Sequence, residues 1–307
     1  MGKHNLVILN LKGKIMKSKT KRYILGFLSA AVVFVFSSFA QNETATETTD
    51  DLMSRIPPKI SDRIIDKRIP SVETAVNTAY NWYCKHTKNG EIPPCPPEMS
   101  FISEHGGVFL GNTDEKVIYL TFDAGYENGN IESILNTMKE KGVTGAFFVL
   151  DNIVKNNSDL IRRMSDEGHL ICNHTAKHKD MTGITDISSF KAELDLLNTA
   201  CADIGVECAP FYRPPEGRFS ESNLGFAKEL GYTTVFWSFA YADWDNNSQP
   251  SPEAAKEKIL SGTHNGMILL LHPTSSTNAK ILGDLIDNWK AEGYRFGTLD
   301  EFNGKKI

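Results

Sequence analysis

Hydrophobic and polar positions follow two alternating rhythms along most of the chain. From residue 116 on, short apolar runs typical of buried strands are separated by segments with the amphipathic period of a helix. The apolar runs cover residues 117–123, 144–150, 169–173, 211–213, 233–239, 267–272 and 294–299. The helical patterns cover residues 131–141, 158–167, 187–202, 221–230, 252–261 and 279–292. This alternation predicts βα units and a parallel sheet.

The number of these units bears on how the sheet is arranged. About seven βα units follow one another, without an internal sequence repeat and without the Gly-rich fingerprint of a dinucleotide-binding sheet. We therefore predict an α/β barrel rather than an open doubly wound sheet.

The first 40 residues have the pattern of a targeting segment. Basic residues at 17–22 precede an apolar run that starts at Tyr23, and small residues follow at 38–40, as in a secretory signal cleaved near Ala40. The apolar run is about 17 residues long, which is also the lower limit for an uncleaved membrane anchor. Both interpretations stay open, and both imply export.

Residues 41–115 lack the βα rhythm. Residues 41–56 are polar and poor in apolar side chains, as in a flexible stalk. Residues 57–115 combine a helix predicted around Val72–Lys85 with a proline-rich segment at 93–97. We expect this extension to pack on the barrel.

The charge of the chain excludes one class of partner. Residues 1–40 hold seven of the 33 Lys and Arg residues and none of the 38 Asp and Glu residues, so cleavage leaves 26 basic side chains and a formal charge of −12. Because phosphate backbones need cationic surfaces, we expect no nucleic-acid partner. We expect a monomer outside the cytoplasmic membrane that contacts lipid only through its N-terminal segment.

Four of the five cysteines form local pairs in the sequence. Cys84 and Cys95 flank the proline-rich segment, and Cys201 and Cys208 flank a helix end. Each pair is compatible with a disulfide in an oxidising compartment or with free thiols. Cys172 lies in a strand, where we expect a structural role.

Reactive side chains recur where the predicted strands end. They are Asp123, His174, Arg213, Asp243 with Trp244, and His272. Because active sites of parallel barrels form at the carboxyl ends of the strands, we expect these residues to converge.

Two of the strand ends carry further polar groups. His174 and His178 are four residues apart, which on a helical turn lets two imidazoles share a metal ion, although solvated helix faces often have the same spacing. In RPPEG, two prolines and a glycine fix the backbone after Arg213, so that a backbone N–H can face a substrate oxyanion. An ordinary rigid turn is the alternative.

The last two strand ends carry apolar surface. Residues 237–245 offer aromatic side chains for sugar stacking and an acid, Asp243, that could orient Arg213. Leu270 forms an apolar wall beside His272, which could act as a general acid.

Taken in order, TFD, HTxxxH, RPPEG, DW and LxH resemble the five motifs of the NodB-type polysaccharide deacetylases, carbohydrate esterase family 4, over residues 116–302. WYCKHTKNG with the proline-rich segment, EKVIYLTFDAGYENG and NHTAKH resemble the branch of spore-forming bacteria that makes muramic δ-lactam in cortex peptidoglycan, back to about residue 80. The resemblance implies a distorted (β/α)7 barrel for residues 116–307 and a metal-dependent hydrolase that removes N-acetyl groups from glycans.

By position, the resemblance implies a role for each motif residue. Asp123 would be the base that activates water, and His272 the acid that protonates the leaving amine. The metal ligands would be His174 and His178, with Zn²⁺ as the first choice and Co²⁺, Ni²⁺ or Mn²⁺ as alternatives.

The resemblance also implies supporting roles. Arg213 would hold Asp123, and Asp243 would tether Arg213. The backbone N–H of Glu216 would face the oxyanion. The acetyl group would lie against Trp244 and Leu270.

Ala124 departs from the family pattern. Most members have a second Asp there as third metal ligand, and the δ-lactam branch commonly has Asn, whereas alanine has no donor atom. We therefore expect weaker metal binding, with water or substrate in the open positions. Glu127 or Asn128 could substitute from the loop, or could serve only the loop surface.

These residues lead to three hypotheses for function. The first is a secreted deacetylase of N-acetylmuramic acid in peptide-stripped peptidoglycan. The second is the same chemistry on N-acetylglucosamine or chitin-like oligomers. The third is a catalytically silent glycan-binding barrel, suggested by Ala124 but disfavoured by the intact acid and base.

Overall fold

The computed structural model describes residues 76–303 of the chain. The predicted signal segment or anchor, the stalk and the start of the extension lie outside these residues. Within residues 76–303, no helix is both long and apolar enough to cross a membrane.

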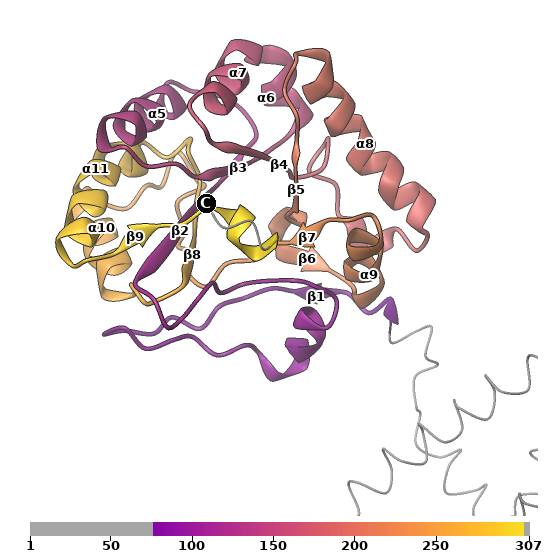
Figure 1. Cartoon of the computed structure of the whole chain (residues 1–307), viewed down its shortest axis with the longest axis horizontal. Coiled ribbons are helices and arrows are strands. Elements are labelled where there is room, and N and C mark those ends of the chain that lie inside the picture. Colours follow the sequence, from indigo (N-terminus) through magenta and orange to yellow (C-terminus); the bar gives the residue numbers. More distant parts are fainter. Residues whose placement is uncertain (1–75, 304–307) are drawn as a thin grey trace, which may run out of the picture. The chain divides into compact units, whose positions relative to one another are not determined.

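The alternating strands and helices form one curled parallel sheet, which confirms the predicted barrel in an incomplete form (Figure 1). The strands are ordered β7-β5-β4-β3-β2-β8, with β9 beside β2, and every pairing is parallel. Their bounds are β2 Val117–Ala124, β3 Ala146–Val149, β4 Leu170–Asn173, β5 Ala209–Tyr212, β7 Thr233–Thr234, β8 Met267–Leu271 and β9 Arg295–Phe296.

Helices surround the outer face of this sheet (Figure 1). They are α5 Asn130–Lys141, α6 Asp151–Asn156, α7 Ser158–Asp166, α8 Ile187–Asp203, α9 Glu221–Glu229, α10 Pro252–Ser261 and α11 Ser276–Ala291. Short 3-10 helices are η2 Pro97–Ser103, η3 Met181–Gly183, η4 Pro215–Gly217 and η5 Leu299–Asn303. All six predicted helices are present within a few residues. The extra helix, α6, is too short for its period to be recognised.

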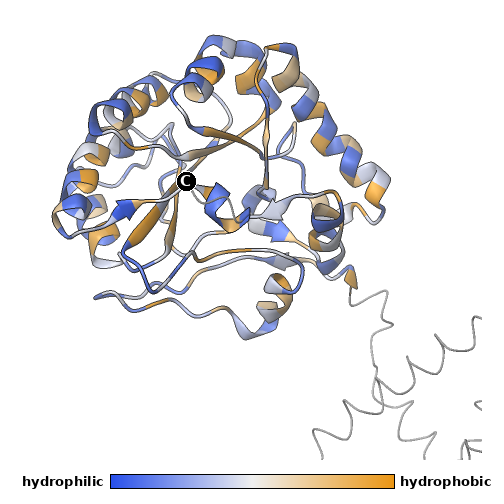
Figure 2. Ribbon diagram, viewed as in Figure 1, coloured by the Kyte–Doolittle hydropathy of each residue, from blue (hydrophilic) through white to orange (hydrophobic). Residues whose placement is uncertain are grey.

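The strands are buried on both faces. On β2, Leu120 and Phe122 pack with the helices, whereas Val117 and Tyr119 point into the barrel, because successive side chains of a strand alternate. Apolar colours therefore concentrate on the strands and alternate along the helices (Figure 2). Leu299 of η5 packs against this interior cluster.

The predicted strand at residues 233–239 is wrong beyond Thr234. The segment pairs first with β5, then through Val235 with Val108, and finally through Phe239 with Leu269 of β8. It therefore crosses the gap between the two sheet edges, so that its hydrogen bonds are shared among three neighbours.

The helix predicted around Val72–Lys85 is wrong over its described part beyond Val76. There the chain forms β1 Tyr80–Asn81, which pairs antiparallel with β6 Arg218–Phe219. Tyr80 and Trp82 pack in one aromatic cluster, so tertiary packing overrides the local helical period.

All five cysteines are free thiols. The Cys84 thiol contacts the backbone of Ala240, while the Cys95 thiol donates to the Met99 carbonyl. The thiols of Cys201 and Cys208 are in hydrogen-bonding contact. Cys172 is fully buried inside the barrel, as expected of a structural residue.

Candidate active site

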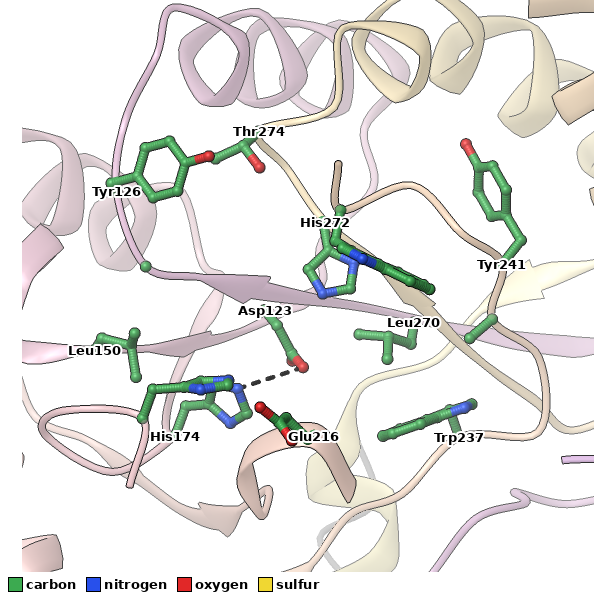
Figure 3. A pocket seen from close by; sticks show the side chains of 14 residues that line it. Asp123, Tyr126, Leu150, His174, Glu216, Trp237, Tyr241, Leu270, His272 and Thr274 are labelled. Carbon is green, nitrogen blue, oxygen red and sulfur yellow. Dashed lines mark ion pairs between the residues drawn. The ribbon is translucent and has the colours of Figure 1, made fainter. Parts of the chain in front are cut away.

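A cavity of about 660 Å³ lies at the carboxyl ends of the strands (Figure 3). Seven of the nine predicted site residues line it: Asp123, His174, His178, Glu216, Trp244, Leu270 and His272. The other two, Arg213 and Asp243, are almost fully buried and contact Asp123 and His272 directly. The remaining lining residues are Gly125, Tyr126, Leu150, Trp237, Ala240, Tyr241 and Thr274.

Asp123 and Arg213 form the first pair of the site. Arg213 Nη1 donates to Asp123 Oδ1 at 2.8 Å. The other guanidinium nitrogens donate to Thr121 Oγ1 and to the carbonyls of Val235 and Phe236. The guanidinium also lies 4.1 Å from the centre of the Phe148 ring. Arg213 is therefore fixed on every side and aims one N–H at the carboxylate.

This environment keeps Asp123 ionised. Burial by itself would raise the pKa of the carboxyl group, but Arg213, His174 and His272 together lower it below its ordinary value. A carboxylate at the end of β2 is thus available as a proton acceptor at neutral pH, with Oδ2 not engaged by Arg213.

His174 presents a nitrogen lone pair to this carboxylate. Its Nδ1 lies 2.8 Å from the Arg213 carbonyl, which can only accept, so Nδ1 carries the proton. Burial lowers the pKa of His174 to about 4, so the ring is neutral at pH 7. Its Nε2 lies 3.5 Å from Asp123 Oδ2. Two acceptors that face each other in this way suit a cation.

His178 lies beside His174, but not on a helical turn. Residues 174–178 are irregular, and Thr175 and His178 have left-handed backbone angles, with φ of 67° and 56°. The predicted helical turn is therefore wrong. The loop nevertheless brings the two imidazole centres to 5.1 Å. An imidazole pair of this kind fits a divalent metal.

No group of three His, Cys, Asp or Glu side chains within residues 76–303 forms a ready metal site. Ala124 is fully buried in the hydrophobic cluster that contains Phe122 and Ala176. Position 124 thus contributes packing rather than a ligand. Glu127 Oε1 accepts from the Gly129 N–H, and Asn128 donates to the Thr274 carbonyl, so both serve the loop.

His272 and Asp243 form the second pair. His272 Nδ1 donates to Asp243 Oδ1 at 2.7 Å, and the His272 backbone N–H donates to Oδ2 at 2.8 Å. The expected tether between Asp243 and Arg213 is wrong, because all Arg213 contacts go elsewhere. With Nδ1 occupied, His272 has Nε2 left for chemistry in the cavity.

The charge of Asp243 also sets the protonation of His272. Burial would lower the pKa of this imidazole, but the hydrogen bond and charge of Asp243, helped by Asp123, raise it above its ordinary value. His272 is therefore suited to give up a proton near neutral pH.

Two supporting residues had no assigned role in the sequence. Asn278 donates to Asp243 Oδ2 and to the His272 carbonyl, and it is placed there because Ser275 caps α11. Thr121 accepts from Arg213 and lies on the same face of β2 as Asp123, two residues on. The alternation of side chains along a strand is the sequence pattern that could have placed Thr121 in the site. No local sequence pattern indicates a site role for Asn278.

The rest of the cavity is apolar and aromatic. Leu270 and Trp237 form part of its wall, and the Trp244 ring lies edge-on to His272 with 62% of its surface exposed. Glu216, in the loop after β5, also lines the cavity and has a left-handed φ of 57°. Within residues 76–303, three of the four non-glycine residues with such angles lie in the site loops, where backbone strain often accompanies function.

The fold agrees with the comparisons with known proteins. A family model described as polysaccharide deacetylase matches residues 110–235. The chain belongs to this family of carbohydrate esterases and is a hydrolase that acts on amide C–N bonds.

The chain is also similar to individual members of this family. The chain is 42% identical over 236 residues to the peptidoglycan-N-acetylmuramic acid deacetylase PdaA of Bacillus subtilis, covering 76% of this chain and 89% of PdaA. The solved structure of PdaA, a family 4 carbohydrate esterase, matches with a TM-score of 0.72 and 41% identity, over 75% of this chain and 99% of that chain. A chitooligosaccharide deacetylase of Rhizobium leguminosarum is 33% identical over 191 residues, covering 61% of this chain and 82% of the relative.

Proposed function

We propose that this protein is an exported, metal-dependent deacetylase of N-acetylmuramic acid residues in peptide-stripped peptidoglycan strands. The observation that carries the proposal is the placement of two pairs at one cavity, Asp123 held by Arg213 and His272 held by Asp243. The similarity to PdaA supports the choice of sugar. The freed amine would then condense with the lactyl carboxyl group, with loss of one water molecule, to give the muramic δ-lactam of spore cortex.

The two pairs divide the proton transfers of amide hydrolysis. Asp123 takes a proton from water as the oxygen adds to the acetyl carbon. His272 gives a proton from Nε2 to the amine nitrogen as the C–N bond breaks, which releases acetate. Arg213 and Asp243 do not touch the substrate in this scheme, because they hold the base and the acid in place.

A divalent metal would be held by His174 and His178 and, when bound, would polarise the amide carbonyl. Zn²⁺ is the first choice, and Co²⁺, Ni²⁺ and Mn²⁺ also suit imidazole ligands. The Glu216 N–H faces the oxyanion, and the acetyl methyl lies against Leu270 and Trp244.

Acetate release from defined glycans tests this proposal. We expect the purified protein with added Zn²⁺ to release acetate from peptide-stripped strands and mass spectrometry to find the loss on muramic acid. Chelator should stop the reaction, and Asp123→Asn should lower kcat by about 10²–10⁴-fold. A folded wild-type protein that releases no acetate with any of the four metals would contradict the proposal.

Deacetylation of N-acetylglucosamine is the second candidate, favoured by the similarity to the chitooligosaccharide deacetylase. Chitin oligomers and stripped peptidoglycan assayed side by side separate the two, because the product carries its free amine on a different sugar. A silent glycan-binding barrel would bind both glycans and deacetylate neither.

A further inference from the structure

One described segment of the extension contacts two of the loops that line the cavity. We call residues 80–86 the strap, residues 214–219 the proline loop and residues 237–241 the aromatic loop. The strap overlaps the end of the helix predicted around Val72–Lys85. None of its residues belongs to the five motifs that carry the proposed catalytic residues, although residues 82–86 begin the stretch WYCKHTKNG. In Figure 1 it runs through β1, along the side of the barrel where the N-terminal part of the described chain lies.

The strap is paired with the proline loop through backbone hydrogen bonds. Tyr80 pairs with Phe219 and Asn81 with Arg218 in an antiparallel ladder. The Trp82 N–H then donates to the Gly217 carbonyl at 2.8 Å. This pairing fixes the backbone directly after Glu216.

The strap is joined to the aromatic loop through side chains. Trp82 Nε1 donates to the Trp237 carbonyl at 2.9 Å. His86 Nε2 lies 2.8 Å from the Ala240 carbonyl, which can only accept, so Nε2 is the donor. The His86 ring also stacks on Phe239, with 4.9 Å between ring centres and 14° between planes.

The strap and the two loops meet without free space at Gly217. A Cβ atom at this position would come within 2.9 Å of the Trp237 ring and 3.1 Å of Trp82 Cβ. Trp82 is buried, with its ring 5.0 Å from those of Phe109 and Phe236. A shift of Trp82 would therefore be transmitted to both loops.

Both loops supply cavity wall, through Glu216 on one side and Trp237, Ala240 and Tyr241 on the other. We propose that Trp82 and His86 are positioning residues, which hold the proline loop and the aromatic loop at the separation that the glycan requires. The identity of the glycan rests on the proposed function, whereas the effect on the loops does not.

Three variants separate hydrogen bonding from packing. Trp82→Phe keeps an aromatic ring in the cluster but removes the donor to Trp237. His86→Phe keeps a ring over Phe239 but removes the donor to Ala240, and His86→Gln keeps a donor. Tyr83→Phe is the matched control, because the Tyr83 hydroxyl donates to Glu98 and to no cavity loop.

Hydrogen–deuterium exchange and steady-state kinetics are measured on all four variants and the wild type. Loss of one hydrogen bond raises the equilibrium constant for opening of the loop about fivefold. We therefore expect amides of the aromatic loop to exchange about fivefold faster in Trp82→Phe and His86→Phe. We expect KM for the glycan to rise about fivefold with a smaller change in kcat. His86→Gln should recover most of the KM, and Tyr83→Phe should match the wild type.

Unchanged exchange in the aromatic loop, or faster exchange with unchanged KM, would overturn the proposal. If Trp82→Phe does not fold, His86→Phe decides, because His86 is exposed and does not belong to the core. If the wild type releases no acetate, the proposed function fails, and the affinity of the same variants for the glycan, measured by calorimetry, replaces KM.

Discussion

Asp243→Asn removes the negative charge that raises the pKa of His272 against the effect of burial, while it keeps nearly the same side-chain volume. In the wild type, His272 donates to this carboxylate from both Nδ1 and its backbone N–H. A hydrogen bond to a charged group stabilises by about 1.5–3 kcal/mol, against about 0.5–1.5 kcal/mol for a neutral one. The substitution therefore removes about 1–2 kcal/mol of support from the imidazolium, which lowers the pKa of His272 by about one unit.

The sign of the pH effect follows from the role of His272 as acid. The imidazolium is present below the pKa of His272 and is lost as the pH rises through it. The alkaline limb of kcat should therefore move to lower pH by about one unit in Asp243→Asn. The other charged groups that influence His272, Asp123 and Arg213, are unchanged in this variant.

The assay is initial acetate release at saturating glycan across the pH range, with circular dichroism to verify the fold. Asn278→Ala is the control, because it removes a donor to Asp243 Oδ2 but leaves the carboxylate charge. Its alkaline limb should stay in place although its thermal stability falls. A folded Asp243→Asn enzyme whose alkaline limb does not move would refute the role of Asp243 as the group that raises the pKa of His272.

Three further outcomes are expected. Arg213→Met should lower the free energy of unfolding in urea by about 3–5 kcal/mol at neutral pH, since it leaves Asp123 buried without its partner; a loss below about 1 kcal/mol would contradict this. Ala124→Asp should destabilise the metal-free protein by at least about 2 kcal/mol, because a carboxylate would replace a fully buried methyl group; equal urea midpoints in chelator would argue against that burial. His178→Ala should weaken Zn²⁺ binding about tenfold or more in calorimetry, and unchanged affinity would exclude His178 as a ligand.

The barrel and the types of residue that meet in the site follow from the sequence alone. Repeated βα units place all strand ends at one edge, so Asp123, His174, Arg213 and His272 had to approach one another whatever the loop details. Strand alternation likewise places Thr121 on the face of Asp123. These features depend on local periodicity, which one sequence displays.

The pairing of these groups follows from the folded structure and not from the local sequence. Asp243 contacts His272, 29 residues away, rather than Arg213, and the Asn278 that steadies it carries no local signal. The strap begins with strand β1 rather than continuing as a helix, because Trp82 packs near Trp237 and donates to its carbonyl, 155 residues further along the chain. Such choices depend on packing between distant segments, whose energies exceed the weak local preference of any single stretch.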